Sequence, residues 1–161
     1  DVFQGMARHY GVFYPMQTFS RQKRVSFEEI PCFIEGSGEE ETDAIEALAS
    51  QLSHRGYRLS SEARKYLHLS AVFACNFVKH CYAISAELLE KHGIPFDVML
   101  PLIDETAAKV HQMLPKDAQT GPAVRYDENV IRAQSQLLKN NPLVKDIYDR
   151  MSMNIHRLSE E

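Results

Sequence analysis

The sequence predicts a mainly α-helical protein in which a short strand–helix–strand segment precedes an all-helical region. Two observations support this fold class. Short apolar runs that end at Pro or Gly occur within residues 1–60, and such runs are typical of strands. In residues 61–161 the apolar side chains recur at spacings of three and four, as they do on one face of a helix. We therefore expect two domains, 1–60 and 61–161.

The first domain is expected to contain three short strands. In two places an apolar run ends at a turn-forming residue, Pro15 in one case and Gly36 in the other. A third and shorter run follows Gly56. The predicted strands are Gly11–Tyr14, Pro31–Glu35 and Tyr57–Leu59, and we expect the first two to be buried.

A helix is expected between the second and third strands. Ser37 and Glu40 have the spacing of a capping box, in which the serine caps the helix and the glutamate reaches back to it. Apolar residues then recur at helical spacing, and they are Ile45, Leu48, Ala49 and Leu52. A strand, a helix and a strand in this order predict a βαβ unit with a parallel sheet.

The longest predicted helix begins at a serine cap, Ser60 or Ser61, and runs to about His92, where Gly93 and Pro95 end it. Only one charged residue lies between positions 67 and 86. Two apolar stripes follow the helix, one of Leu67, Ala71, Ala74, Val78, Cys81, Ser85 and Leu88, the other of Tyr66, Leu69, Phe73, Phe77 and Ile84. We expect it to be buried on most sides, as the axis of a bundle or of a dimer.

Three further helices are expected. One covers about Phe96–Met113, with a kink or break near Leu100 because Pro101 lies inside it. The next begins at a cap on Asp127, and the last follows Pro142. The last helix has a narrow apolar seam, typical of packing on one neighbour or on a partner chain. The seam consists of Val144, Tyr148, Met151, Ile155 and Leu158.

Composition excludes several classes of protein. The 161 residues carry a net charge of −4, whereas a nucleic-acid-binding protein usually has a basic stripe. No apolar run reaches the roughly 18–20 residues that span a bilayer, so we expect no membrane partner. Three cysteines without paired spacing are typical of a reducing compartment, and we expect a cytoplasmic protein.

The common nucleotide, metal and nucleophile motifs are absent from the sequence. It contains no G-x-G-x-x-G, no P-loop and no G-x-S-x-G. It also has no HExxH pair and no Cys/His set with zinc spacing. We therefore expect no metal site and no independent nucleotide site on this chain.

Three polar residues interrupt the apolar pattern of the longest helix. At about 100° per residue, His68 and Asn76 lie about 80° apart on its surface, and Lys79 lies about 20° from His68. Polar groups on a buried helix need hydrogen-bond partners. The partners could be neighbouring backbone groups, which is the more common case, or a substrate to which His68 transfers a proton.

A second candidate site is the loop before Asp127. Gly121 lets the backbone approach a ligand, and the helix start that follows presents free N–H groups to anions. Thr120 lies in the same loop, and Arg125 could bind a carboxylate or phosphate with two hydrogen bonds. The alternative is an ordinary loop between two helices.

Four segments together resemble a known family. They are Gly11–Ser20 (GVFYPMQTFS), His68–Phe77 (HLSAVFACNF), Leu102–Val110 (LIDETAAKV) and Gln119–Asp127 (QTGPAVRYD). The family is that of bacterial Rossmann-like NADP oxidoreductases with a C-terminal helical domain of unknown function. It is related to pyrroline-5-carboxylate reductase, ketopantoate reductase and 6-phosphogluconate dehydrogenase. The resemblance covers nearly the whole chain, but only the C-terminal part of such a protein.

The resemblance implies a layout and a set of site residues. Residues 1–60 would be the last βαβ portion of a Rossmann-like domain, and 61–161 a helical domain, like the C-terminal domain of 6-phosphogluconate dehydrogenase, that closes the cleft and forms a homodimer. The family's HPxQxF turn beside the nicotinamide corresponds to Tyr14, Pro15 and Gln17, with Tyr14 in place of the usual histidine. NADP or NAD would be bound mainly by a glycine-rich segment preceding this chain.

Two hypotheses for the function follow. In the first, hydride passes between nicotinamide and a small carbonyl- or imine-type substrate. His68 and Asn76 would act on that substrate, while Gln17, Lys79, Thr120 and Arg125 line its site. In the second, the helical region is a non-catalytic module for dimerisation or ligand sensing, because its longest helix and its last helix supply apolar surface.

Overall fold

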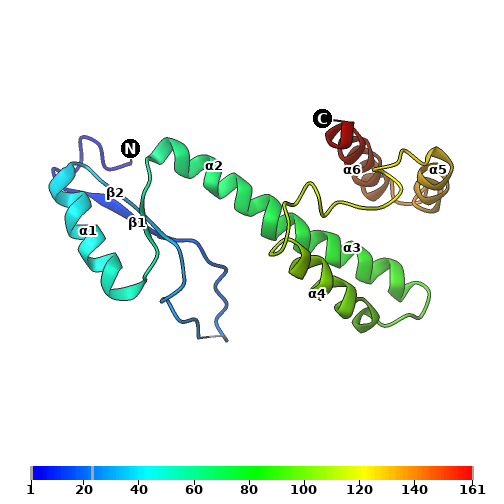
Figure 1. The fold of residues 1–161 in the computed structure, drawn as a ribbon, viewed down its shortest axis with the longest axis horizontal. Helices are drawn as coiled ribbons and strands as arrows, with labels where there is room; N and C mark the ends of the chain where they lie inside the picture. The colour runs from blue at the N-terminus through cyan, green and yellow to red at the C-terminus, as the bar shows by residue number, and fades with distance from the viewer. Residues whose placement is uncertain (1, 23, 161) are drawn as a thin grey trace. The chain divides into compact units, whose positions relative to one another are not determined.

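The computed structural model describes residues 2–22 and 24–160. The chain forms two compact units, Asp1–Val78 and Lys79–Glu161, and each is described by itself below. Figure 1 shows the elements of both. None of the helices in the described residues is long and apolar enough to cross a membrane.

The first unit contains a three-stranded sheet in the order β1-β2-β3. Strand β2 (Cys32–Gly36) lies parallel to β3 (Gly56–Arg58), and helix α1 (Glu39–Leu52) connects them, which confirms the predicted βαβ unit. Strand β1 (Gly11–Pro15) instead lies antiparallel to β2, so the sheet is mixed. No helix crosses over between β1 and β2 in the described part of that connection, and a parallel pairing would need one.

The core of the first unit lies between β2 and α1. Cys32 and Ile34 on alternate positions of β2 are fully buried, and Ala49 of α1 is buried with them. Strand β1 is only half-buried, so the prediction that it is buried was wrong. Ser53, directly after α1, donates a hydrogen bond of 2.6 Å to the carbonyl of Ile30 and thereby joins the helix end to the segment before β2.

The beginning of α1 differs from the predicted capping box. Gly38 is the N-cap and no side chain caps the helix. The hydroxyl of Ser37 instead accepts a hydrogen bond from the backbone of Tyr10, a residue distant in sequence. Thr42 stabilises the turn before α1, because its hydroxyl accepts a hydrogen bond from Gly36 N at 3.0 Å and donates one to Gly38 O at 2.8 Å.

The long predicted helix consists of three consecutive segments. Helix α2 (Ser61–Ala71) begins at Ser60, whose hydroxyl accepts from Ala63 N as predicted. A π-helical segment, η1 (Val72–Phe77), follows, and α3 (Val78–Glu90) continues from it. A π-helix has i→i+5 hydrogen bonds and often marks a functional site.

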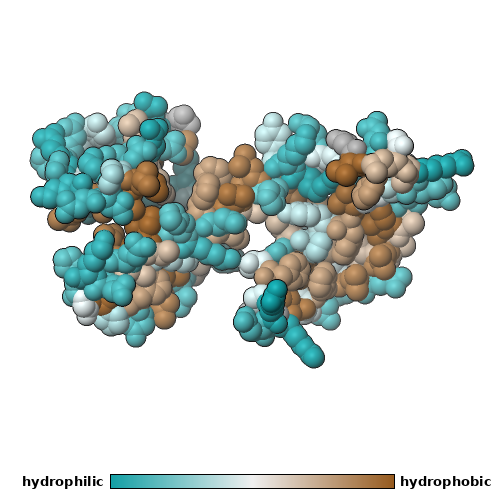
Figure 2. Space-filling view, turned by 180° about the vertical axis from the view of Figure 1, so that it is seen from behind, coloured by the Kyte–Doolittle hydropathy of each residue, from teal (hydrophilic) through white to brown (hydrophobic). Residues whose placement is uncertain are grey.

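No residue of these three segments is buried, so the prediction of a helix buried on most sides was wrong for this chain. We use the name aromatic stripe for Tyr66, Leu69, Phe73 and Phe77. Each of these side chains is between 49% and 66% exposed. Figure 2 colours the apolar residues on one face of the molecule brown. The sequence pattern correctly marks an apolar face, but the described residues of this chain do not cover it.

In the described residues, the second unit continues after α3 with a 3₁₀ turn and three α-helices. Phe96–Met99 is a 3₁₀ turn (η2) that leads into α4 (Leu100–Lys109), with Pro101 in the first turn of α4. The break predicted near Leu100 is thus confirmed, although α4 ends before Met113. Helix α5 (Glu128–Leu137) and helix α6 (Pro142–Glu160) follow.

Helices α5 and α6 pack against each other. Asp127 caps α5 as predicted, accepting from Val130 N at 3.2 Å. Tyr148 of α6 donates a hydrogen bond of 2.7 Å to the Gln134 side chain of α5. Of the predicted seam on α6, Met151 and Leu158 remain about half exposed, so packing within the chain covers only part of it.

Candidate functional site

Two of the predicted site residues meet in the first unit. The hydroxyl of Tyr14, on β1, lies 3.0 Å from Nδ1 of His68, on α2. Tyr14 is half-buried, whereas His68 is exposed. The hydrogen bond joins residues 54 positions apart, one on the sheet and one on the helix.

A second contact holds α2 on the sheet. Glu35, near the end of β2, accepts hydrogen bonds from Ser61 N at 2.8 Å, Ser61 Oγ at 2.6 Å and Arg64 Nη1 at 2.8 Å. Partial burial alone raises the pKa of Glu35, but the hydrogen bonds from Ser61 and Arg64 and the charge of Arg64 outweigh it, so the pKa lies below its ordinary value. The first turn of α2 is therefore fixed one turn before His68.

The other predicted residues of the β1 turn lie next to Tyr14 in the chain. Pro15 ends β1, and Gln17 is exposed. The side-chain oxygen of Gln17 accepts a hydrogen bond from Thr18 N at 2.8 Å, which stabilises the turn locally. A substrate contact of Gln17 stays a prediction.

Asn76 lies in the π-helical segment and is exposed. The expected separation of about 80° from His68 assumed α-helical winding throughout. That assumption was wrong over Val72–Phe77, because a π-helix takes in more residues per turn. Lys79, in α3, belongs to the second unit.

The loop before α5 presents both of its predicted residues to solvent. Thr120 and Arg125 are exposed. Gly121 has φ +106°, and a Cβ at this position would meet nothing within 4 Å. The space beside the Gly121 backbone is thus open, but no described group gathers with Arg125 to form a defined anion site.

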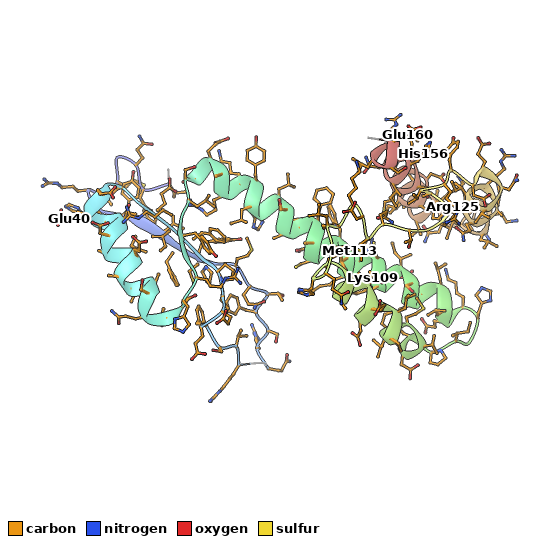
Figure 3. All side chains as sticks on the ribbon, viewed as in Figure 1. Glu40, Lys109, Met113, Arg125, His156 and Glu160 are labelled. Carbon is orange, nitrogen blue, oxygen red and sulfur yellow. The ribbon has the colours of Figure 1, made fainter. Side chains whose placement is uncertain are left out.

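A stacking contact that the sequence did not reveal fixes this loop on α6. The rings of Tyr126 and His156 stack with centroids 4.3 Å apart, and Tyr126 has a left-handed backbone, φ 50°. Ser159 donates a hydrogen bond of 3.3 Å to the carbonyl of Val124. Figure 3 shows His156 and Glu160 on α6 and Arg125 in the loop. His156 is thus a packing residue of this loop.

The turn between β2 and α1 does not fit a cofactor pyrophosphate. A Cβ on Gly36 would lie 2.4 Å from Thr42 N, so the turn is already filled by its own helix. Three carboxylates, Glu39, Glu40 and Glu41, occupy the first turn of α1 and would repel an anion. This turn is therefore not proposed as a pyrophosphate site.

The described residues offer few other reactive clusters. No three His, Cys, Asp or Glu side chains among them could hold a metal ion together. Cys32, Cys75 and Cys81 are unpaired. Burial raises the pKa of the Cys32 thiol, which keeps it protonated and unreactive.

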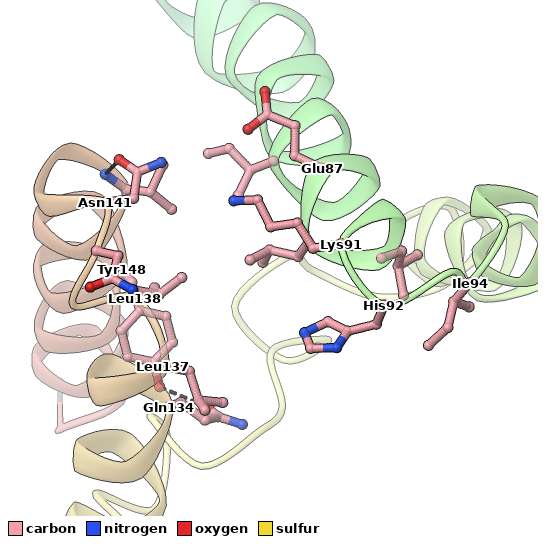
Figure 4. Close-up of a pocket in the computed structure, with 14 residues that line it drawn as sticks. Glu87, Lys91, His92, Ile94, Gln134, Leu137, Leu138, Asn141 and Tyr148 are labelled. Atoms are coloured by element: carbon pink, nitrogen blue, oxygen red, sulfur yellow. Dashed lines mark hydrogen bonds between the residues drawn. The ribbon is translucent and has the colours of Figure 1, made fainter.

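A cavity of about 770 Å³ lies in the second unit, between the end of α3 and helices α5 and α6 (Figure 4). Its lining is mostly apolar, and none of the predicted site residues belongs to it. Lys91 and His92 are among its polar groups. The apolar lining includes Ile84, Leu88, Leu89, Ile94, Leu137, Leu138 and Val144.

Comparisons with known proteins agree with the fold described above. A family model described as "Domain of unknown function (DUF2520)" matches residues 30–155. No curated protein matches the chain. Among solved structures, one named "putative NADP oxidoreductase BF3122", from Bacteroides fragilis, is 58% identical and superposes with a TM-score of 0.91.

The match to the Bacteroides fragilis structure covers 97% of this chain and 60% of that one, so this chain spans about three fifths of its length. The protein TM1727 from Thermotoga maritima is 23% identical, with a TM-score of 0.71 over 83% of this chain and 55% of that one. The second likeness concerns the fold alone.

Proposed function

This chain belongs to the family described as "Domain of unknown function (DUF2520)", and we propose that it is the C-terminal portion of an NAD(P)-dependent oxidoreductase. The substrate is a small carbonyl- or imine-type compound. The similarity to a Bacteroides fragilis structure named as an NADP oxidoreductase supports the proposal. The resemblance of the Tyr14–Phe19 turn to a nicotinamide-side turn supports it further.

The contact between Tyr14 and His68 is the observation that carries this proposal. Tyr14 lies in the turn that resembles the family's nicotinamide-side turn, and His68 is a polar residue on an apolar helix. The Tyr14 hydroxyl lies 3.0 Å from Nδ1 of His68. The two residues thus share one site, which supports a reaction centre at the β1–α2 junction.

In the proposed reaction the nicotinamide supplies or accepts the hydride. His68 hydrogen-bonds to the oxygen or nitrogen of the substrate, where negative charge develops, and can exchange a proton there. Asn76 adds a second polar contact. We propose that Gln17 also contacts the substrate. In the second unit, we propose that Lys79, Thr120 and Arg125 are available to an anionic group.

The cofactor, NADP or NAD, would be held mainly by a part of the longer protein that is not in this chain. Tyr14 and Pro15 would contact only the nicotinamide end of the cofactor. We therefore expect the 161-residue chain by itself to bind NADPH weakly or not at all, as measured by NADPH fluorescence. The longer protein should bind it.

The main test compares two histidine variants in the longer protein. His68→Gln should lower kcat at least about a hundredfold, the lower end of typical general acid–base and oxyanion effects, and leave the melting temperature unchanged. His80→Gln is the matched control, because His80 is also an exposed histidine on the same run of helix. Equal loss of turnover and stability in His68→Gln would show a structural role and contradict the proposal.

A second candidate function is a non-catalytic module for dimerisation or ligand sensing. The exposure of the aromatic stripe favours it, because a contiguous exposed apolar patch is typical of an interaction site. We propose a homodimer through the helical region. A strict monomer at micromolar concentration in analytical ultracentrifugation would remove the support for this candidate.

A further inference from the structure

We infer that Tyr14 is a positioning residue for His68, and that its hydroxyl holds the neutral imidazole in the Nε2–H tautomer. The imidazole then presents an N–H donor, rather than a lone pair, to the substrate. The inference rests on the proposed function for its catalytic meaning. The hydrogen bond and the tautomer of His68 concern this chain alone and do not depend on that function.

Two separate parts of the fold hold the partners of this hydrogen bond. Tyr14 lies in β1, where it pairs with Phe33 of β2, so the strand register fixes its backbone. His68 lies on α2, whose first turn is tied to Glu35 through Ser61 and Arg64. The distance of 3.0 Å between the Tyr14 hydroxyl and His68 Nδ1 is therefore set by the sheet and by the helix end.

The chemistry of the two groups decides which one donates. A neutral imidazole has one nitrogen that donates and one that accepts. A phenol hydroxyl donates readily, whereas its oxygen, conjugated with the ring, is a weaker acceptor. The better arrangement is thus Tyr14 O–H donating to Nδ1, which leaves the hydrogen of the imidazole on Nε2.

The exposure of His68 leaves its second ring nitrogen, Nε2, available to a substrate. Its Nδ1 is occupied by Tyr14, while the ring is exposed and Nε2 can be reached from outside. A neutral N–H donor stabilises developing negative charge on a carbonyl oxygen or an imine nitrogen without itself carrying charge. Tyr14 thereby acts through His68, a role different from the cofactor contact that the resemblance implies.

Nitrogen NMR can read the tautomer directly. In ¹⁵N-labelled 161-residue chain at about pH 8.5, where histidine is mostly neutral, long-range ¹H–¹⁵N correlation should show His68 predominantly as Nε2–H. Tyr14→Phe should lower the ratio of Nε2–H to Nδ1–H about 2- to 12-fold, the range that one net hydrogen bond of ordinary strength produces. Tyr66→Phe is the control, because Tyr66 is an exposed tyrosine on the same helix and should leave the ratio unchanged.

A predominantly Nδ1–H form in the wild-type chain, or an unchanged ratio in Tyr14→Phe, would overturn the inference. The result does not depend on the proposed function, since no cofactor or substrate is present. In the longer protein, Tyr14→Phe should lower kcat, whereas loss of a cofactor contact alone would raise the KM for NADPH and leave kcat unchanged. If the tautomer responds as expected but His68→Gln keeps full turnover, the proposed function fails and the tautomer assignment stands.

Discussion

The guanidinium of Arg64 lies 2.8 Å from the carboxylate of Glu35, and the side chains are only 16% and 31% exposed. This ion pair joins the first turn of α2 to the end of β2. Because His68 follows Arg64 by about one helical turn, the pair determines where the imidazole lies relative to Tyr14. Its removal should affect stability and site geometry together.

Replacing Glu35 by Gln should lower the free energy of unfolding at pH 7 by about 1.5–3 kcal/mol, the range for hydrogen bonds to a charged group. The folded-state pKa of Glu35 lies below its ordinary value of 4.5. The stabilisation is therefore complete above that value and is lost as the pH falls through the folded-state pKa. Urea unfolding should show a larger difference between wild type and variant at pH 7 than at pH 3.

The control for this experiment is Glu62→Gln, which removes an exposed ion pair with Lys65 on the same helix. Exposed pairs contribute little to stability, so this variant should unfold like the wild type at both pH values. An equal effect of the two variants would contradict the special role of Glu35.

Gly36→Ala should destabilise the first unit by about 1–3 kcal/mol, the usual cost of overpacking. The added Cβ would lie 2.4 Å from the backbone nitrogen of Thr42, and backbone cannot move aside as a flexible side chain can. Gly56→Ala is the matched control, because its nearest neighbour, Ile34 Cδ1, is 3.8 Å away. Thermal unfolding followed by circular dichroism should separate the two variants, and equal melting temperatures would contradict the prediction.

His156→Ala should loosen the loop that contains Thr120 and Arg125. The stack of His156 on Tyr126 would be lost, and Tyr126 would no longer be held in its left-handed conformation. Amide hydrogen exchange at residues 123–127 should become at least about fivefold faster, since an aromatic pair contributes about 1 kcal/mol.

His156→Phe should retain slow exchange in this loop, because phenylalanine can stack in the same place. It also removes Nδ1, a buried atom without a hydrogen-bond partner among the described residues, so stability should not fall. Fast exchange in both variants would show that stacking is not what holds the loop.

Replacing Phe73 and Phe77 together by Ser should weaken self-association at least about tenfold, because exposed aromatic residues commonly dominate protein interfaces. The rings contact each other edge to face, with centroids 4.9 Å apart, and form the C-terminal end of the aromatic stripe. Sedimentation equilibrium measures the effect. Lys65→Ser, an exposed change on the same helix, should leave association unchanged, and an equal effect of both changes would contradict the prediction.

Local features of the fold could be predicted from the sequence. Ser60 and Asp127 cap their helices as expected, because a cap depends on residues within one turn. The break near Leu100 follows from Pro101 in the same way. The predicted cap at Ser37 failed because Tyr10, a residue outside the local segment, occupies its hydroxyl.

Long-range features could not be predicted in this way. The hydrogen bond between Tyr14 and His68 depends on how β1 and α2 pack, and no local pattern encodes its distance. The stack of Tyr126 on His156 likewise joins a loop to a separate helix. The aromatic stripe shows that a pattern can mark an apolar face correctly without revealing whether this chain covers it.

The π-helical segment Val72–Phe77 has a consequence for aligning this sequence with others. A π turn contains one residue more than an α turn, so a homologue that is α-helical throughout would be one residue shorter at this point. The correct alignment would then place a gap inside a helix. An alignment that forbids such a gap would shift every later position by one and compare Lys79 with the wrong residue.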